Sequence, residues 1–208
     1  YPLITWTQGD TVSAAAVRDS SCKREIKINR LTEESVTDEL RELLRDGGCA
    51  GIIVNTVKRA QLLAESLKAA FPEKRVILYH AQFVTEDRIH RERELVRTVG
   101  KNSTPEYRDN VIVVGTQVLE QSLDIDFDHL ISDLCPVDLL LQRIGRLHRH
   151  DRIRPAPLQA AVCSVLSGNE ASKKIYDEWL LLQTEERLPG TVRLPEDIPV
   201  LVESVYSA

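Results

Sequence analysis

Val111-Ile112-Val113-Val114-Gly115-Thr116 decides the fold of this 208-residue chain. Four consecutive β-branched residues that end in Gly-Thr are typical of a buried parallel strand that enters a functional loop. Downstream, Gln142-Arg143-Ile144-Gly145-Arg146-Leu147-His148-Arg149 places three arginines within seven residues. Arginine keeps its charge and presents a rigid fork of donors, so this spacing suits the binding of phosphate oxygens. The alternative for such a run is a solvated basic helix end.

Strand and helix patterns alternate on both sides of this stretch. Apolar or alternating runs predict strands at 23–29, 49–54, 75–80, 111–114, 129–132 and 158–166. Helical spacing predicts a first helix from a Thr32 cap to Gly47-Gly48, and a second that carries Ala60, Leu63, Ala64 and Leu67 and stops before Pro72. A third helix is predicted over 85–99. A fourth begins at an Asn169 cap and carries Ile175, Trp179 and Leu182. This order predicts an α/β fold with a parallel sheet and helices on both faces.

Polar residues follow the carboxyl ends of four predicted strands, where parallel sheets place their ligand sites. They are Asn55-Thr56, His80, Gly115-Thr116 and Asp133. Thr116 offers a hydroxyl, and its neighbours offer backbone N–H groups, to a strand phosphate. For Asn55-Thr56 a plain helix N-cap is an equally good interpretation, and the two roles are compatible. A lone strand-end histidine such as His80 is more often a hydrogen-bonded structural residue.

Two of these stretches resemble helicase motifs. Residues 142–149 resemble motif VI of superfamily 2 helicases, and Gly115–Asp126 resembles their motif V. Residues 120–128, Ser132-Asp133-Leu134 and 145–150 are similar to the CRISPR-associated helicase of type I systems, which is usually joined to an HD nuclease. The resemblance extends from Cys49 to His150. It implies the RecA-like fold of the second motor domain, also called the helicase C-terminal domain, in a helicase-nuclease that unwinds and degrades invading DNA.

The resemblance also implies roles for individual residues. Arg146 and Arg149 would act as arginine fingers on the γ-phosphate of ATP, with Gln142 orienting nearby groups, because phosphoryl transfer spreads charge over the terminal oxygens. Asp124 would accept from the ribose, and Arg143 and Gly145 would lie on the nucleotide side. Single-stranded DNA would contact Asn55, Thr56, His80, Gly115 and Thr116. Ala81 and Gln82 stand where the family often has Ser and Arg, so a basic DNA contact there would move to Arg88 or Arg91.

The acidic run that follows motif V has two interpretations. Asp124, Asp126 and Asp128 form either a solvated acidic turn or a group placed toward the nucleotide, because carboxylates beside a DNA backbone are unfavourable. Glu120 and Gln121 lie between the two predicted sites, so they are candidates for coupling DNA to nucleotide.

Two components of an ATPase have no sequence signal in this chain. The chain has no G-x-x-x-x-G-K-[ST] loop and no acidic Mg²⁺ motif on an apolar strand. We therefore expect the first RecA-like domain, outside this chain, to hold most of the ATP and the Mg²⁺, and the chain alone to be inactive. Five scattered histidines predict no metal or nuclease centre here. The other partners implied by the resemblance are a CRISPR surveillance complex and an HD nuclease domain or subunit.

Composition limits the remaining possibilities. A formal net charge of −5 excludes nucleic-acid binding by bulk charge, so DNA contacts must come from a local face. Four cysteines without a C-x-x-C pair indicate reduced thiols. No apolar run is long enough to span a membrane, and the resemblance implies a cytoplasmic prokaryotic protein. The absence of methionine indicates an excised piece of a longer chain.

The predicted organisation has three parts. Residues 1–22 form a poorly defined N-terminal segment, 23–166 the RecA-like domain, and 167–208 a C-terminal helix and a proline-broken tail that packs on the core or starts an accessory domain. Two functional alternatives remain beside the DNA motor. One is an RNA or repair helicase domain of the same superfamily, and the other is a non-catalytic interaction module, which would not need Thr116, Asp124, Arg146 and Arg149.

Overall fold

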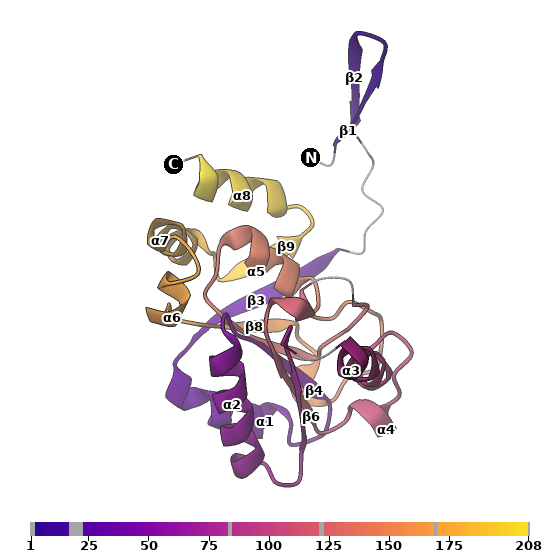
Figure 1. Ribbon diagram of the computed structural model, residues 1–208, viewed down its shortest axis with the longest axis vertical. Helices are drawn as coiled ribbons and strands as arrows, with labels where there is room; N and C mark the ends of the chain where they lie inside the picture. The colour runs from indigo at the N-terminus through magenta and orange to yellow at the C-terminus, as the bar shows by residue number, and fades with distance from the viewer. Residues whose placement is uncertain (1–2, 17–22, 83–84, 121–122, 169, 208) are drawn as a thin grey trace.

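The computed structural model describes residues 3–16, 23–82, 85–120, 123–168 and 170–207, with the side chains of 3, 16 and 85–88 left undescribed (Figure 1). A seven-stranded sheet forms the centre. Its strand order is β5 (Arg75–Tyr79), β6 (Val111–Gly115), β4 (Cys49–Ile53), β7 (His129–Asp133), β8 (Val162–Leu166), β3 (Arg24–Leu31) and β9 (Thr191–Leu194). Six neighbouring strands run parallel, and only β9 pairs antiparallel within this described sheet. The predicted α/β, RecA-like architecture is confirmed.

One face of the sheet is covered by two helices. These are α1 (Val36–Leu43), which follows the short 3₁₀ helix η1 (Glu33–Ser35), and α2 (Val57–Ala70). Their apolar stripes pack on the alternate side chains of β4, β6 and β7 in one buried cluster. Thr32 precedes η1 but makes no capping bond to a backbone N–H group, in contrast to the predicted cap. Gly47 and Gly48, at φ values of 97° and 84°, form the turn that was predicted to follow α1.

The opposite face is covered by more helices. They are α3 (Thr85–Val99), the one-turn α4 (Pro105–Arg108), α5 (Val137–Ile144), α7 (Glu178–Arg187) and α8 (Ile198–Tyr206). Figure 1 shows α3 and α4 on the right and α7 and α8 at the upper left. Side chains of α3, α5, α7 and α8 join the other face of the strands in the larger core cluster. Helices thus cover both faces, as predicted.

Three local predictions near the C-terminal end are wrong. Leu158 belongs to the 3₁₀ helix η3 (Ala156–Leu158), and the strand begins only at Val162. The single helix predicted after residue 169 is two helices, α6 (Glu170–Lys173) and α7, because Asp177 accepts from the N–H groups of Trp179 and Leu180 and starts a new helix. The cap predicted at residue 169 lies outside the described residues.

The apolar stripe predicted for that helix is also wrong. Ile175, Trp179 and Leu182 are 44%, 44% and 49% exposed, whereas Leu181 and Thr184 are buried. The tail contains regular structure as well, because β9 adds to the sheet and α8 packs on α5 and α7. At the other end, β1 (Leu3–Gln8) and β2 (Thr11–Ala16) form an antiparallel hairpin around Gly9.

No helix among the described residues combines the length and the apolar character needed to cross a bilayer.

Candidate nucleotide and nucleic-acid site

The arginine-rich segment 145–149 runs beside residues 125–127 at the amino end of β7. Helix α5 leads from the carboxyl end of β7 back to this place and ends at Ile144. The Phe127 N–H donates to the Arg146 carbonyl at 2.8 Å, and the His148 N–H donates to the Phe127 carbonyl at 3.0 Å. Phe127 packs over Gly51 of β4, where an added Cβ would lie 2.5 Å from the ring. The absence of a side chain at Gly51 therefore lets Phe127, and with it the segment 145–149, pack close to β4.

Asp124, Arg149 and His150 meet on the surface beside this segment. The Arg149 Nε donates to Asp124 Oδ1 at 2.8 Å, and the His150 Nε2 lies 2.9 Å from the same oxygen. Partial burial acts to raise the pKa of Asp124, but the hydrogen bonds from Arg149 and His150 outweigh it and lower that pKa. The Arg149 and Asp124 side chains are 40% and 50% exposed. The pair is therefore charged and accessible.

Arg146 lies next to this group but is folded onto the loop that precedes it. Its two terminal amino groups donate to the Leu123 carbonyl at 2.7 Å and the Glu120 carbonyl at 2.5 Å. Its Nε is buried and has no hydrogen-bond partner among the described residues. Burial and the neighbouring charge of Arg149 lower the pKa of the guanidinium. Arg146 thus carries one unsatisfied buried donor beside an exposed arginine.

Arg143 does not lie on the surface that carries Arg149 and Asp124, because its side chain is fully buried. Its Nε donates to Glu120 Oε1 at 2.7 Å, one terminal amino group to Ser132 Oγ at 3.0 Å, and the other to Asn55 Oδ1 at 2.9 Å. All the guanidinium nitrogens therefore bond to protein groups. Burial raises the pKa of Glu120, although the charge of Arg143 opposes that change.

Asn55, predicted to contact DNA, is likewise turned inward. Its side-chain amide donates to the Leu134 carbonyl and to Ser172 Oγ, both at 2.8 Å, while its oxygen accepts from Arg143. Its carbonyl accepts from Gln117 Nε2 at 3.0 Å. Asn55 thus joins the end of β4 to the loop after β6 and to the C-terminal segment.

The other residues predicted to contact DNA do lie together at the carboxyl ends of the strands. Thr56 caps α2, since its hydroxyl accepts from the Arg59 N–H at 3.2 Å. Gly115 and Thr116 end β6, and the Thr116 N–H donates to the Tyr79 carbonyl at 3.3 Å. His80 follows β5, where burial, and secondly the charge of Arg91, lower its pKa. Thr56 is the most open of these residues, the others being buried.

Two predicted residues of the motor site lie elsewhere or have another explanation. Gln142 is exposed on the side of α5 that faces α8, where it lines a hollow of about 550 Å³ together with Leu141 and Val202. It is not grouped with Asp124 and Arg149. Gly145 has a φ of −58°, which any residue adopts, so conformation does not require glycine there. An added Cβ would instead lie 3.1 Å from the Gln142 carbonyl oxygen, so glycine relieves crowding against the last turn of α5.

The interpretation of the acidic run as a solvated turn is wrong for Asp126 and Asp128, because these residues are buried. Asp126 accepts from Arg152 at 2.6 Å and from Arg154 at 3.1 Å, and Asp128 accepts from Arg108 at 2.6 Å and from Arg154 at 2.9 Å. Burial acts to raise the pKa of Asp128, but Arg108 lowers it. We name these five residues the buried charge cluster. It fixes the chain just beyond Arg149 to the amino end of the sheet.

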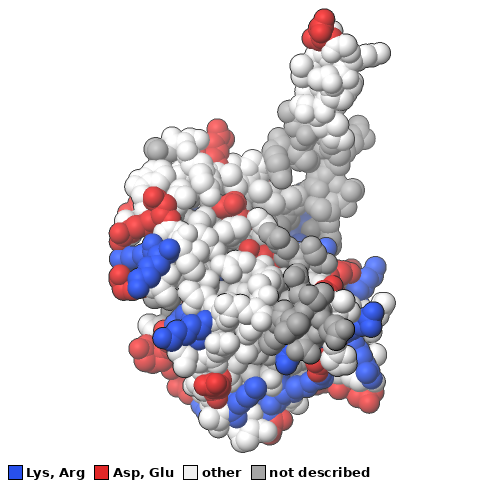
Figure 2. All heavy atoms as spheres, viewed as in Figure 1, with Lys and Arg blue, Asp and Glu red and all other residues white. Residues whose placement is uncertain are grey.

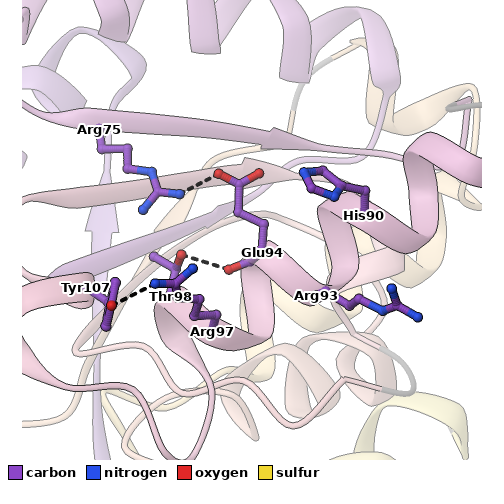
Figure 3. Close-up of a pocket in the computed structure, with 7 residues that line it drawn as sticks. All are labelled: Arg75, His90, Arg93, Glu94, Arg97, Thr98 and Tyr107. Atoms are coloured by element: carbon purple, nitrogen blue, oxygen red, sulfur yellow. Dashed lines mark hydrogen bonds and ion pairs between the residues drawn. The ribbon is translucent and has the colours of Figure 1, made fainter.

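Further cationic side chains line a hollow beside Asp124. Figure 3 shows its first part, about 420 Å³ between α3, α4 and β5, where Arg75 pairs with Glu94 and Arg97 donates to the Tyr107 hydroxyl at 2.7 Å. The Arg97 guanidinium also stands over the Tyr107 ring, 4.4 Å from its centre. A second part of about 580 Å³ continues past Arg97 to Asp124. Asp124 therefore borders a concave surface.

Charge on the face drawn in Figure 2 is mixed, because Lys and Arg atoms alternate with Asp and Glu atoms over its lower half. This agrees with a net charge of −5. Contacts to an anionic partner must therefore be local. Within the part of the chain that the structure covers, no group of three or more His, Cys, Asp or Glu side chains is arranged to hold a metal ion.

Comparison with known proteins identifies the family. The family model described as "CRISPR-associated nuclease/helicase Cas3, C-terminal" matches residues 46–152, a range that includes the whole arginine-rich segment 145–149. The chain belongs to this family. The residues that resembled motifs V and VI are thus those of a Cas3-like helicase C-terminal, RecA-like domain, and the predicted family is confirmed.

The similarity to individual relatives covers all or nearly all of the chain. A CRISPR-associated nuclease/helicase Cas3 of Streptococcus thermophilus is 43% identical over 100% of this chain and 23% of its own length. A solved CRISPR-associated protein matches with a TM-score of 0.91 and 37% identity over 100% of this chain and 25% of that one. The structure titled T. fusca Cas3-ATP matches with a TM-score of 0.82 and 30% identity over 94% and 25%. This chain therefore spans about a quarter of the Cas3 relatives it matches.

The sequence alone missed several residues of the site. Gln117, Ser172 and Tyr176 link the strand-end loops, and Arg108, Arg152 and Arg154 pair with the buried aspartates. The sequence did carry a signal for the buried aspartates, because Asp126 and Asp128 alternate with the apolar residues Ile125 and Phe127. Arg152 and Arg154 show the same spacing of two residues. Ser172 and Tyr176 carried none, because they lie outside the recognised motifs.

Proposed function

We propose that this chain is the second motor domain of an ATP-dependent Cas3 helicase-nuclease and helps to couple ATP hydrolysis to movement on single-stranded DNA. One observation carries the proposal. A continuous series of hydrogen bonds runs from Arg146 through Glu120 and Arg143 to Asn55, and so connects the surface of Arg149 with the carboxyl ends of the strands. A motor needs two such sites that respond to each other.

The arginine surface suits a nucleotide phosphate. Arg149 engages Asp124 through Nε, and no hydrogen bond among the described residues uses its terminal amino groups. Those donors are available to a γ-phosphate oxygen, and Asp124 is available to a ribose hydroxyl. Arg146 adds its unpaired Nε beside them. If ATP bound there, these arginines would stabilise the negative charge that develops on its phosphate oxygens as the terminal phosphoanhydride bond breaks.

The rest of the motor lies in other domains on this proposal. The first RecA-like domain would supply the phosphate loop and the Mg²⁺ ligands, because the sequence of this chain contains neither motif. An HD nuclease domain or subunit and an RNA-guided CRISPR surveillance complex would be the other partners. Thr56, Gly115 and Thr116 would meet phosphates of the single strand, while Asn55 and Arg143 would position them from inside.

The partition between domains predicts the behaviour of the isolated chain. The purified 208-residue chain should hydrolyse ATP at no more than the background rate, with or without single-stranded DNA, since it has arginines but no phosphate cradle. Phosphate release at millimolar ATP measures this. Turnover that DNA stimulates, and that survives repeated purification, would contradict the partition.

The strand-end site predicts weak and salt-dependent DNA binding. Half of a cleft supplies only a few phosphate contacts, so the chain should bind a labelled oligothymidine weakly. Its affinity should fall severalfold between about 50 and 200 mM salt, because each phosphate contact releases counterions. Fluorescence anisotropy at four salt concentrations gives the slope. Affinity that does not change with salt, or that is higher for duplex DNA, would place binding on another surface.

A further inference from the structure

The C-terminal segment inserts two hydroxyl groups between the strand-end loops. Ser172 lies in α6 and is buried, and Tyr176 follows it and packs against the core. Ser172 Oγ accepts from the Asn55 side-chain amide at 2.8 Å. The Tyr176 hydroxyl accepts from Gln117 Nε2 at 3.1 Å. Each hydroxyl thus satisfies a donor on a loop far away in the sequence.

Gln117 holds the two loops together. The same Nε2 that donates to Tyr176 also donates to the Asn55 carbonyl at 3.0 Å. The amide has two N–H groups, so both are used and the orientation of the side chain is fixed. Gln117 directly follows Thr116, and Asn55 directly precedes Thr56. The relative placement of the two threonines therefore depends on this arrangement.

The bonds of Ser172 and Tyr176 do not touch the nucleotide surface. Arg149 and His150 bond to Asp124 beyond the C-terminal end of α5, whereas Ser172 and Tyr176 bond to Asn55 and Gln117 at the carboxyl ends of the strands. The hydrogen bonds described above connect the two places through Asn55, Arg143 and Glu120. Loss of one hydroxyl should consequently alter the strand-end loops first and leave the chemistry of the nucleotide unchanged.

We propose that Ser172 and Tyr176 are positioning residues through which the C-terminal segment sets the affinity of the strand-end site for single-stranded nucleic acid. The inference rests on the proposed function, since it assigns a control element to that site. It is more specific than that function, because it separates DNA affinity from turnover. Movement of α6 away from the sheet would release Asn55 and Gln117 together and lower the affinity.

The test uses the full-length protein and its DNA-stimulated ATP turnover. Tyr176→Phe removes the acceptor of one Gln117 N–H and keeps the ring. We expect the oligothymidine concentration that gives half-maximal stimulation to rise about fivefold, because a partly buried donor loses its partner. The maximal rate at saturating DNA and the KM for ATP should stay unchanged. Ser172→Ala should act in the same direction.

Two controls separate this effect from general damage. Tyr206→Phe removes a comparable hydroxyl in α8, which donates to Asp138 on the surface, and should leave DNA affinity at the wild-type value. Melting temperatures show whether each variant is folded. A folded Tyr176→Phe protein with unchanged half-saturation, or with a lower maximal rate only, would overturn the inference.

A third variant distinguishes this failure from failure of the proposed function. The double variant Thr56→Val/Thr116→Val removes the hydroxyls that should meet phosphate. If it weakens DNA stimulation while Tyr176→Phe does not, only the inference about the C-terminal segment is wrong. If the double variant leaves half-saturation unchanged, the strand-end DNA site is wrong and the inference falls with it.

Discussion

Arg149→Ala in the full-length protein should lower ATP turnover about a thousandfold, as expected for the loss of an arginine finger. The terminal amino groups of Arg149 bond to no described residue, so alanine removes little that the fold requires. Arg146→Ala should lower turnover to a similar extent. It should also lower the melting temperature slightly, because the Leu123 and Glu120 carbonyls lose their donor. The turnover rate per folded molecule, beside the melting temperature, is the measurement.

Lysine and a distant arginine serve as controls. Arg149→Lys should restore little activity, because an ammonium group does not reproduce the planar fork. Arg193→Ala removes another exposed arginine that pairs with an aspartate, Asp197, and should leave turnover unchanged. If Arg146→Ala and Arg149→Ala both retain full turnover per folded molecule, the segment 142–149 does not face a nucleotide.

Arg143→Met should instead act on stability and lower the free energy of unfolding of this chain by about 3–5 kcal/mol, because it leaves Glu120 buried without a counter-charge. Burial raises the pKa of Glu120, and without Arg143 that pKa should rise further. A group with a raised folded-state pKa contributes most stability below its unfolded pKa and loses that contribution as pH rises through the folded value. The deficit should therefore grow from about pH 4.3 upward. Urea unfolding at several pH values measures it.

The double variant Arg143→Met/Glu120→Gln removes the unpaired charge and should recover part of the loss. These measurements also decide the role of Arg143, which the motif placed on the nucleotide side. An Arg143→Met chain with wild-type stability, in a full-length protein without turnover, would show that Arg143 leaves its buried position to reach the nucleotide.

The sequence predicted the features that depend on local pattern. The β-branched run at 111–114 and the apolar runs at 49–54 and 129–132 are central strands, because fully buried parallel strands need apolar side chains on both faces. The polar residues after them lie together for the same reason, since parallel strands end at one edge. Helicase motifs added the family and the fold, both of which are confirmed.

Residue identity did not predict which way each arginine points. Arg143 and Arg146 are three apart, a spacing that would put them on one face of a helix. Helix α5 ends at Ile144, so Arg146 leaves the helical path while Arg143 turns inward to Glu120. The same limit applies to Asp126 and Asp128. Their burial depends on Arg108, Arg152 and Arg154, which no sequence period places beside them.

The tail was underestimated because short edge elements carry weak patterns. Strand β9 has four residues and lies between Pro189 and Pro195, which fit the prediction of a broken tail. An edge strand needs partners on one side only, so prolines next to it do no harm. Pairing with β3 supplies those partners, and this contact between residues far apart in sequence is invisible to local pattern.

The antiparallel pairing of β9 with β3 has a mechanical consequence. Arg24, where the chain enters the sheet, pairs with Leu194, where the chain leaves it, so both connections emerge at one corner. A pulling force applied between these two residues would separate β3 from β9 by breaking their backbone hydrogen bonds one at a time, beginning at Arg24. The parallel strands β4, β6 and β7 lie outside that line of force. Tension from neighbouring parts of a longer chain would thus peel the outer strand while the strands that carry the candidate site keep their register.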